Sequence, residues 1–218
     1  MSYDLCVFWL EKAVSTEAAL ELLDGEECVE CSPQALGDFL GAVLADFPAL
    51  EEAEESPWAG TPCLDGNRIF VALTYSAAQE FTEYLLQLAQ RYELALLDYQ
   101  RPLLFLPPKF SEGEKGRVVC PCLPIDMAAS GQLLEDLLPL VVGAEEPFVV
   151  LERAPHFYMQ CYWWPEGFDL EYRDGGPEAH FASVAKLSLA EVLQALLEYM
   201  DGACGWKARH RFELMEFE

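Results

Sequence analysis

Two carboxylates and a histidine in the second half of the chain could form a metal or acid–base site. Asp169 and Glu171 are two residues apart in a run that alternates apolar and polar residues. Residues i and i+2 of a β-strand project from the same face, so the two carboxylates would be neighbours. His180 lies in a following run that could form the adjacent strand. Carboxylate and imidazole groups bind divalent metals and perform general acid–base catalysis, so a small metal-dependent hydrolase is one interpretation.

Four cysteines have spacings that could bind zinc. Cys28 and Cys31 form one pair, and Cys120 and Cys122 form the other. The pairs lie in different halves of the chain, and the second lies in an apolar run, where a thiol packs as a small hydrophobic group. Three glutamates near the first pair would raise the pKa of its thiols, which disfavours a redox role. We expect no bound metal, no cofactor and no structural disulfide.

The chain contains no complete catalytic signature. There is no phosphate-binding glycine loop, no Gly-x-Ser-x-Gly elbow and no His-Glu-x-x-His sequence, and the three histidines have no metal-ligand spacing. The sequence therefore predicts a protein that acts by binding and not an enzyme.

Charge is the strongest feature of the composition. The 218 residues include 38 Asp and Glu but 13 Lys and Arg, for a formal charge of −25, with a hydrophobic fraction of 52%. Such a hydrophobic fraction is enough to build a core, so the charge belongs to the surface of a folded protein. This field repels nucleic acids and anionic membranes and attracts basic proteins. The densest acidic run is either a solvated loop or a patch that steers a basic partner, and it consists of Glu51, Glu52, Glu54 and Glu55.

The first residues lack the basic segment and the cleavage site of a secretory signal. No run approaches the roughly 18 apolar residues of a membrane span. We therefore expect a cytoplasmic protein whose eight cysteines are mostly reduced.

A polar segment rich in Pro and Gly, residues 107–116, divides the chain into two predicted domains, 1–110 and 117–218. Both are acidic, with 19 acidic and 5 basic residues in 1–110 and 19 and 8 in 111–218. Each is predicted to be a small α+β domain, a mainly antiparallel sheet with helices packed on one face. Predicted strands cover residues 3–10, 68–75, 94–97, 103–106, 118–123, 148–153, 157–164, 168–173, 179–184 and 206–214. Predicted helices cover residues 16–23, 33–47, 76–92, 130–142 and 188–200. Ser32, Ser76 and Ser188 are the predicted helix caps.

The best-defined local element is a hairpin formed by residues 157–164 and 168–173. With a two-residue turn, its alternation predicts that Trp163 faces Phe168, Cys161 faces Leu170 and Met159 faces Tyr172, all on the core side. The opposite side is polar and rich in aromatic residues. It is either a solvated sheet face or a partner-binding face, because Tyr and Trp dominate interface hot spots. The candidate contact residues on it are Tyr158, Gln160, Tyr162, Trp164, Asp169 and Glu171.

Several segments of the second half are similar to the C-terminal region of bacterial polymorphic-toxin immunity proteins. They lie within residues 146–213 and comprise residues 148–152, 157–160, 168–175, 199–202 and Trp206. The first half resembles uncharacterised small α+β bacterial proteins through residues 56–58 and 94–100. The resemblance implies a cytoplasmic antidote that binds one cognate toxin domain and has no catalytic residues.

Charge supports the same interpretation, because a nuclease-type toxin is basic where it binds phosphates and an anionic inhibitor can occlude that surface. A DNA mimic or another anionic regulator of a nucleic-acid enzyme is an alternative. A hydrolase that uses Asp169, Glu171 and His180 is an alternative of a different class.

Overall fold

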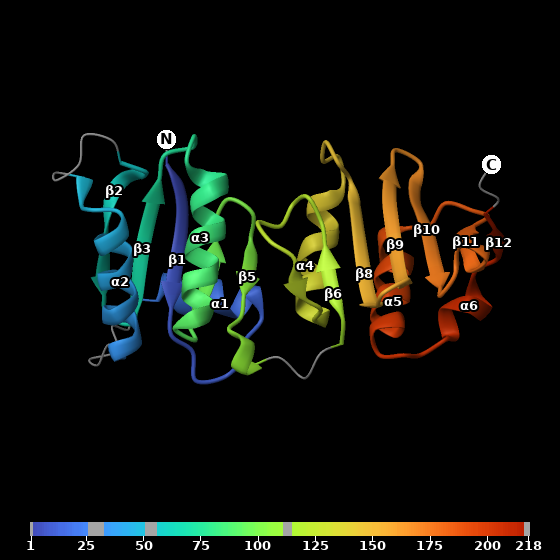
Figure 1. The fold of residues 1–218 in the computed structure, drawn as a ribbon, viewed down its shortest axis with the longest axis horizontal. Coiled ribbons are helices and arrows are strands. Elements are labelled where there is room, and N and C mark those ends of the chain that lie inside the picture. The colour runs from blue at the N-terminus through green and yellow to red at the C-terminus, as the bar shows by residue number, and fades with distance from the viewer. Residues whose placement is uncertain (1, 26–32, 51–55, 111–114, 216–218) are drawn as a thin grey trace. The chain divides into compact units, whose positions relative to one another are not determined.

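The structure is a computed structural model that describes residues 2–25, 33–50, 56–110 and 115–215. The chain divides into two compact units, Met1–Ser111 and Glu112–Glu218, and each contains one antiparallel sheet (Figure 1). The predicted α+β class is confirmed. Among the described helices, none has both the length and the apolar character needed to cross a membrane.

The N-terminal unit is built on a five-stranded sheet with the order β2-β3-β1-β4-β5. Its strands are β1 (Tyr3–Phe8), β2 (Trp58–Asp65), β3 (Arg68–Leu73), β4 (Ala95–Asp98) and β5 (Leu103–Phe105). Its helices are α1 (Thr16–Asp24), α2 (Gln34–Asp46), α3 (Ala78–Arg91) and the short 3-10 helix η2 (Pro108–Phe110). The sequence does not predict β2, because register shifts around Gly60 interrupt its pairing with β3 and hence its alternation.

Helices cover both faces of this sheet, whereas the sequence predicts them on one face. On β1, Cys6 and Phe8 share a core cluster with Leu23 of α1. Leu5 points to the opposite face and is also fully buried. That face lies under α2 and α3 (Figure 1). The strands β4 and β5 are buried on both sides, and near-continuous apolar runs of this kind need cover on two faces.

Two helix starts in this unit differ from the prediction. The N-cap of α3 is Ala77, with φ −93° and ψ −13° and no side-chain cap. Ser76 does not cap the helix, and its hydroxyl lies 3.3 Å from that of Thr74. Pro33 is the N-cap of α2 and not its first helical residue. Ser32 lies outside the described residues.

The C-terminal unit contains a seven-stranded sheet with the order β12-β11-β10-β9-β8-β6-β7. Its strands are β6 (Arg117–Val119), β7 (Met127–Ala128), β8 (Phe148–Ala154), β9 (Phe157–Trp164), β10 (Gly167–Asp174), β11 (His180–Ser183) and β12 (Phe212–Leu214). Its helices are α4 (Gly131–Val141), α5 (Leu189–Met200), α6 (Gly205–Arg209) and the 3-10 helix η3 (Pro177–Ala179). The helices α4 and α5 pack on one face of the sheet, as predicted, and the capping box of Ser188 and Glu191 at the start of α5 is confirmed.

The hairpin of β9 and β10 has the predicted register. Trp164 pairs with Gly167, which leaves Pro165 and Glu166 as a two-residue turn. Gly167 has φ +128°, and a Cβ at this position would lie 2.8 Å from the carbonyl oxygen of Leu187. A side chain is therefore excluded both by the backbone conformation and by the neighbouring segment. The confirmed core-side pairs are Trp163–Phe168, Cys161–Leu170 and Met159–Tyr172.

The last predicted strand, residues 206–214, is wrong in its first half. Gly205–Arg209 form α6, and only Phe212–Leu214 form β12. Trp206 is the reason, because its indole is 1% exposed and packs edge-on against the ring of Tyr172. Its indole N–H donates to the carbonyl oxygen of Ala203 over 3.0 Å. The short helix α6 places this large side chain in the core against Tyr172, a position that we do not expect an extended segment to give it.

Candidate functional site

The candidate site is the face of the C-terminal sheet opposite the helices. Alternate residues of β9 and β10, such as Met159 and Leu170, are fully buried against the helices. Between them lie the side chains of the other face, which the helices leave uncovered. Tyr162 is 39% exposed and Trp164 is 44% exposed. All six residues predicted for this face do lie on it, and they are Tyr158, Gln160, Tyr162, Trp164, Asp169 and Glu171.

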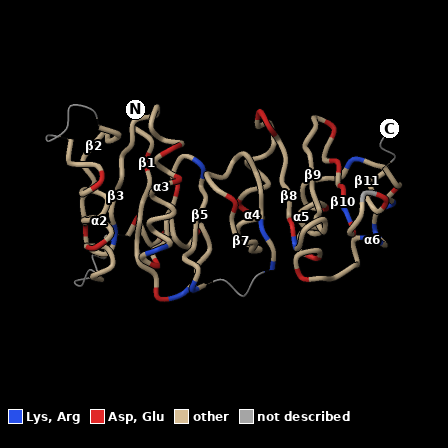
Figure 2. Tube along the Cα trace, in the orientation of Figure 1, with Lys and Arg blue, Asp and Glu red and all other residues tan. Residues whose placement is uncertain are grey.

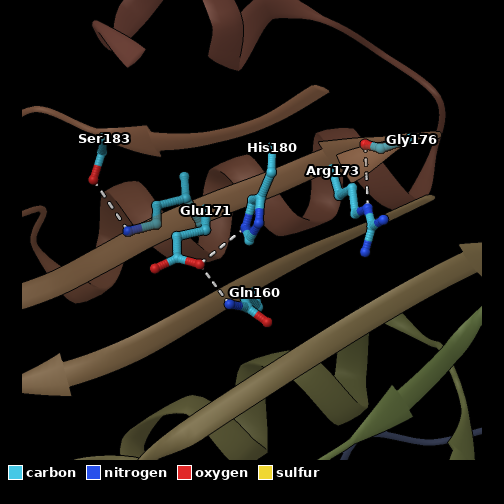
Figure 3. A network of polar contacts seen from close by, with 7 residues as sticks. Gln160, Glu171, Arg173, Gly176, His180 and Ser183 are labelled. Atoms are coloured by element: carbon cyan, nitrogen blue, oxygen red, sulfur yellow. Dashed lines mark hydrogen bonds and ion pairs between the residues drawn. The ribbon is translucent and has the colours of Figure 1, made fainter. Parts of the chain in front are cut away.

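One polar network crosses three strands of this face (Figure 3). The side-chain amide of Gln160 on β9 donates to Glu171 Oε2 on β10 over 2.5 Å. His180 Nε2 on β11 lies 3.1 Å from the same oxygen. A carboxylate can only accept, so this contact requires the hydrogen on Nε2 of His180. The ring of Tyr158 packs edge-on against His180 with 5.8 Å between centroids, and His180 is only 7% exposed.

A second network lies at the hairpin end of the face. Asp169 Oδ2 accepts hydrogen bonds from the indole N–H of Trp164 at 2.8 Å and from Lys186 Nζ at 2.7 Å. Lys186 Nζ also lies 4.9 Å from the centroid of the Trp164 ring. Tyr162 packs against Trp164 at a centroid distance of 4.8 Å. The network holds two exposed aromatic rings in fixed positions, which lowers the entropy cost of binding a partner.

The three residues of the possible hydrolase site are not brought together as one group. Glu171 and His180 are in contact, but Asp169 is bound to Lys186 and Trp164. Across the described ranges, no group of three His, Cys, Asp or Glu residues is arranged to hold a metal ion. The arrangement of Glu171 and His180 with Gln160 is that of a partly buried hydrogen-bond network within a sheet.

A shallow hollow of about 170 Å³ lies in the middle of the face. Three neighbouring strands form it, because Phe148 on β8 pairs with Tyr162 and Val150 pairs with Gln160, while Gln160 pairs with Glu171. The hollow is too small for a drug-sized ligand, whose sites measure about 300–1,000 Å³. It is large enough for one side chain of a protein partner.

The cysteines of the possible zinc site are only partly described. Cys28 and Cys31 lie outside the described residues. The predicted strand 118–123 ends early, at Val119, and the chain turns so that the backbone N–H of Cys122 lies 3.4 Å from Cys120 Sγ. Burial raises the pKa of the Cys120 thiol to about 12 and does the same for Cys161. Both thiols are therefore protonated at neutral pH and are poor metal ligands and nucleophiles.

Positive charges in the C-terminal unit are neutralised locally. Six of the eight Lys and Arg residues after residue 110 form ion pairs with carboxylates, among them Lys207 and Arg209 on α6 and Arg211 beyond it. The remaining pairs involve Lys115, Arg117 and Lys186.

The N-terminal unit has few cations, and its described helices carry acids such as Glu17 and Glu80 (Figure 2). The predicted steering residues Glu51, Glu52, Glu54 and Glu55 lie outside the described residues.

Sequence reasoning missed the contribution of β8 and Lys186 to the face. The alternation of Phe148, Val150 and Glu152 on β8 indicates that they share a face, but a register shift between Glu152 and Ala154 sets their pairing with Tyr162 and Gln160, and a tight turn alone does not predict it. Lys186 gives no such signal, since it lies beyond β11 in an irregular segment.

No family model, curated protein or solved structure matches this chain.

Proposed function

We propose that this chain is an immunity protein that binds a basic toxin domain and neutralises it by occluding the toxin's active surface. The observation that supports this best is the uncovered face of the C-terminal sheet. It presents Tyr162 and Trp164 in fixed positions beside the carboxylates of Asp169 and Glu171. Aromatic anchors within a ring of polar groups are the usual composition of a protein-binding hot spot.

Charge gives the second line of support. A formal charge of −25 accelerates encounter with a basic protein and discourages contact with nucleic acid. A toxin that cleaves nucleic acid needs a basic surface to bind phosphates, so an anionic protein can reach that surface quickly and cover it. We propose that the protein acts in the cytoplasm, where such a toxin acts.

The test is protection from a toxin. The chain is co-expressed with basic toxin domains encoded beside its own gene, and growth is measured together with co-purification of the pair. We expect growth to recover and a stable complex to form. Growth arrest with every such toxin, together with a substrate turnover that Glu171→Gln abolishes, would show that the protein is an enzyme instead.

The surface is tested separately. Tyr162→Ala and Trp164→Ala should each speed dissociation of the complex and cost roughly 2 kcal/mol of affinity. Tyr75→Ala is the matched control, because Tyr75 is 55% exposed and belongs to the N-terminal unit. Equal losses in all three variants would contradict the proposed surface.

Encounter is tested with the acidic run. Replacing Glu51, Glu52, Glu54 and Glu55 together by Gln should slow association and flatten its dependence on salt, with little change in the dissociation rate. Association rates measured at several ionic strengths check this. An unchanged association rate would assign the steering to other acidic residues.

A further inference from the structure

The hollow in the middle of the sheet face combines one apolar side with one polar side. Phe148 and Val150 of β8 form the apolar side, and Tyr162 stands at the rim with an exposed ring. Gln160 and Glu171 form the polar side. None of the described lining residues is Lys or Arg.

The polar side has unused hydrogen-bond acceptors. Gln160 and His180 both bind the same oxygen of Glu171, Oε2. Glu171 Oε1 has no hydrogen-bond partner among the described residues, and it points away from His180 in Figure 3. The side-chain oxygen of Gln160 is a second acceptor without a described partner, but it points away from Glu171 (Figure 3). The Glu171 side chain is 21% exposed, so a charge placed beside it is only partly screened by water.

The existing network also fixes these acceptors. Gln160 holds the carboxylate from β9 and His180 holds it from β11, so Glu171 has little freedom to turn toward solvent. A preorganised carboxylate binds a cation without the entropy cost of ordering a flexible side chain.

We propose that this hollow is a specific site for one arginine side chain of the basic partner, an inference that rests on the proposed function. The aliphatic part of the arginine would lie against Phe148 and Val150. Its guanidinium group would donate to Glu171 Oε1, with its plane near the Tyr162 ring. Arginine fits better than lysine because its planar guanidinium group can donate to a carboxylate and stack on an aromatic ring together.

The site is tested without the partner. N-acetyl-arginine amide is titrated into the isotope-labelled full chain, and NMR shifts are followed at the Gln160 side-chain amide and at the His180 ring. The uncharged isostere N-acetyl-citrulline amide is the matched probe. We expect saturable shifts with the arginine probe, and binding weaker by about tenfold or more with citrulline, because a hydrogen bond between charged groups is lost.

Three variants complete the test. Glu171→Gln should abolish the shifts, whereas Glu135→Gln should retain them, because Glu135 is an exposed residue of α4 on the helical side. Val150→Phe should also abolish binding, because it fills the hollow and leaves the carboxylate in place. Citrulline binding as tight as arginine binding, or full binding to Glu171→Gln or Val150→Phe in folded protein, would overturn the proposal.

Failure of the site and failure of the function have different signatures. Protection from a toxin that Glu171→Gln and Val150→Phe leave intact, with no arginine binding, overturns the site but keeps the proposed function. Arginine binding by a chain that protects against no toxin keeps the site and overturns the function.

Discussion

The two sheets of this protein differ in how many of their faces are covered. In the N-terminal unit α1 packs on one face and α2 and α3 on the other, so adjacent residues of β1, such as Leu5 and Cys6, are both fully buried. In the C-terminal unit the helices pack on one face, and from Tyr158 to Tyr162 the residues of β9 alternate between buried and more exposed positions. An uncovered face can keep polar and aromatic side chains available for a partner, and a doubly covered sheet cannot. This difference is why we propose that the C-terminal unit binds the partner.

The largest effects are expected when neighbouring residues of one strand are mutated and the free energy of unfolding is compared. Met159→Asp should cost about 4 kcal/mol or more, because an unpaired carboxylate would be buried in the core. Gln160→Ala should cost less than about 1 kcal/mol, since it removes one hydrogen bond on the open face. On β1, Leu5→Asp and Cys6→Asp should both be as costly as Met159→Asp. Chemical denaturation measures all four, and tolerance of Cys6→Asp would contradict the doubly covered N-terminal sheet.

The turn that joins β9 and β10 provides the next test. Gly167→Ala should destabilise the protein by about 2 kcal/mol, because both its positive φ and the oxygen of Leu187 oppose a side chain. Gly143 also has a positive φ, +79°, but open space around it, so Gly143→Ala should cost only about 1 kcal/mol. Thermal or urea unfolding of the two variants compares the cost of backbone strain alone, at Gly143, with the cost of strain plus a clash with the Leu187 oxygen, at Gly167. Equal costs would mean that the turn tolerates the side chain.

Mutations of the helix caps should give a smaller difference in stability between the two units. Ser188→Ala should cost about 1 kcal/mol, because it removes a capping box, whereas Ser76→Ala should change stability by less than about 0.5 kcal/mol. Hydrogen bonds from Ser188 hold the pKa of Glu191 below its usual range. This contribution is present above the usual pKa of a glutamate and is lost as the pH falls through the lowered value. The cost of Ser188→Ala, followed by urea unfolding at several pH values, should therefore shrink in acid; a constant cost would exclude a charged cap.

The parts of the fold that the sequence predicts are those in which local pattern and tertiary environment agree. The register of β9 and β10 follows from alternation together with a two-residue turn, because one face is core and the other is open. The sequence does not predict that helices cover both faces of the N-terminal sheet. A continuous apolar run shows that a strand is buried but not which helices pack on its faces. The α6 segment is missed because Trp206 takes its conformation from a pocket formed by distant residues.

The same reasoning explains what could be predicted of the candidate site. The sequence predicts its six residues on β9 and β10, because they occupy the polar positions of two strands that alternate polar and apolar residues. The closeness of Glu171 and His180 follows from the neighbouring positions of β10 and β11, although Glu171 is opposite Ala182 in the ladder. The role of Glu171 Oε2 as an acceptor shared by His180 and Gln160 depends on side-chain torsions. Lys186 reaches Asp169 from an irregular segment, for which no periodic pattern exists.

The seven-stranded sheet ends in very short strands, β7 with two residues and β12 with three. Strand edges of this length offer too few unpaired backbone groups to recruit a strand from another molecule. A protein can then display an aromatic sheet face at high concentration without growing into filaments by edge-to-edge addition. In the proposed function, recognition takes place on the face, where side chains select the partner, and not at the edges, where any extended backbone could pair.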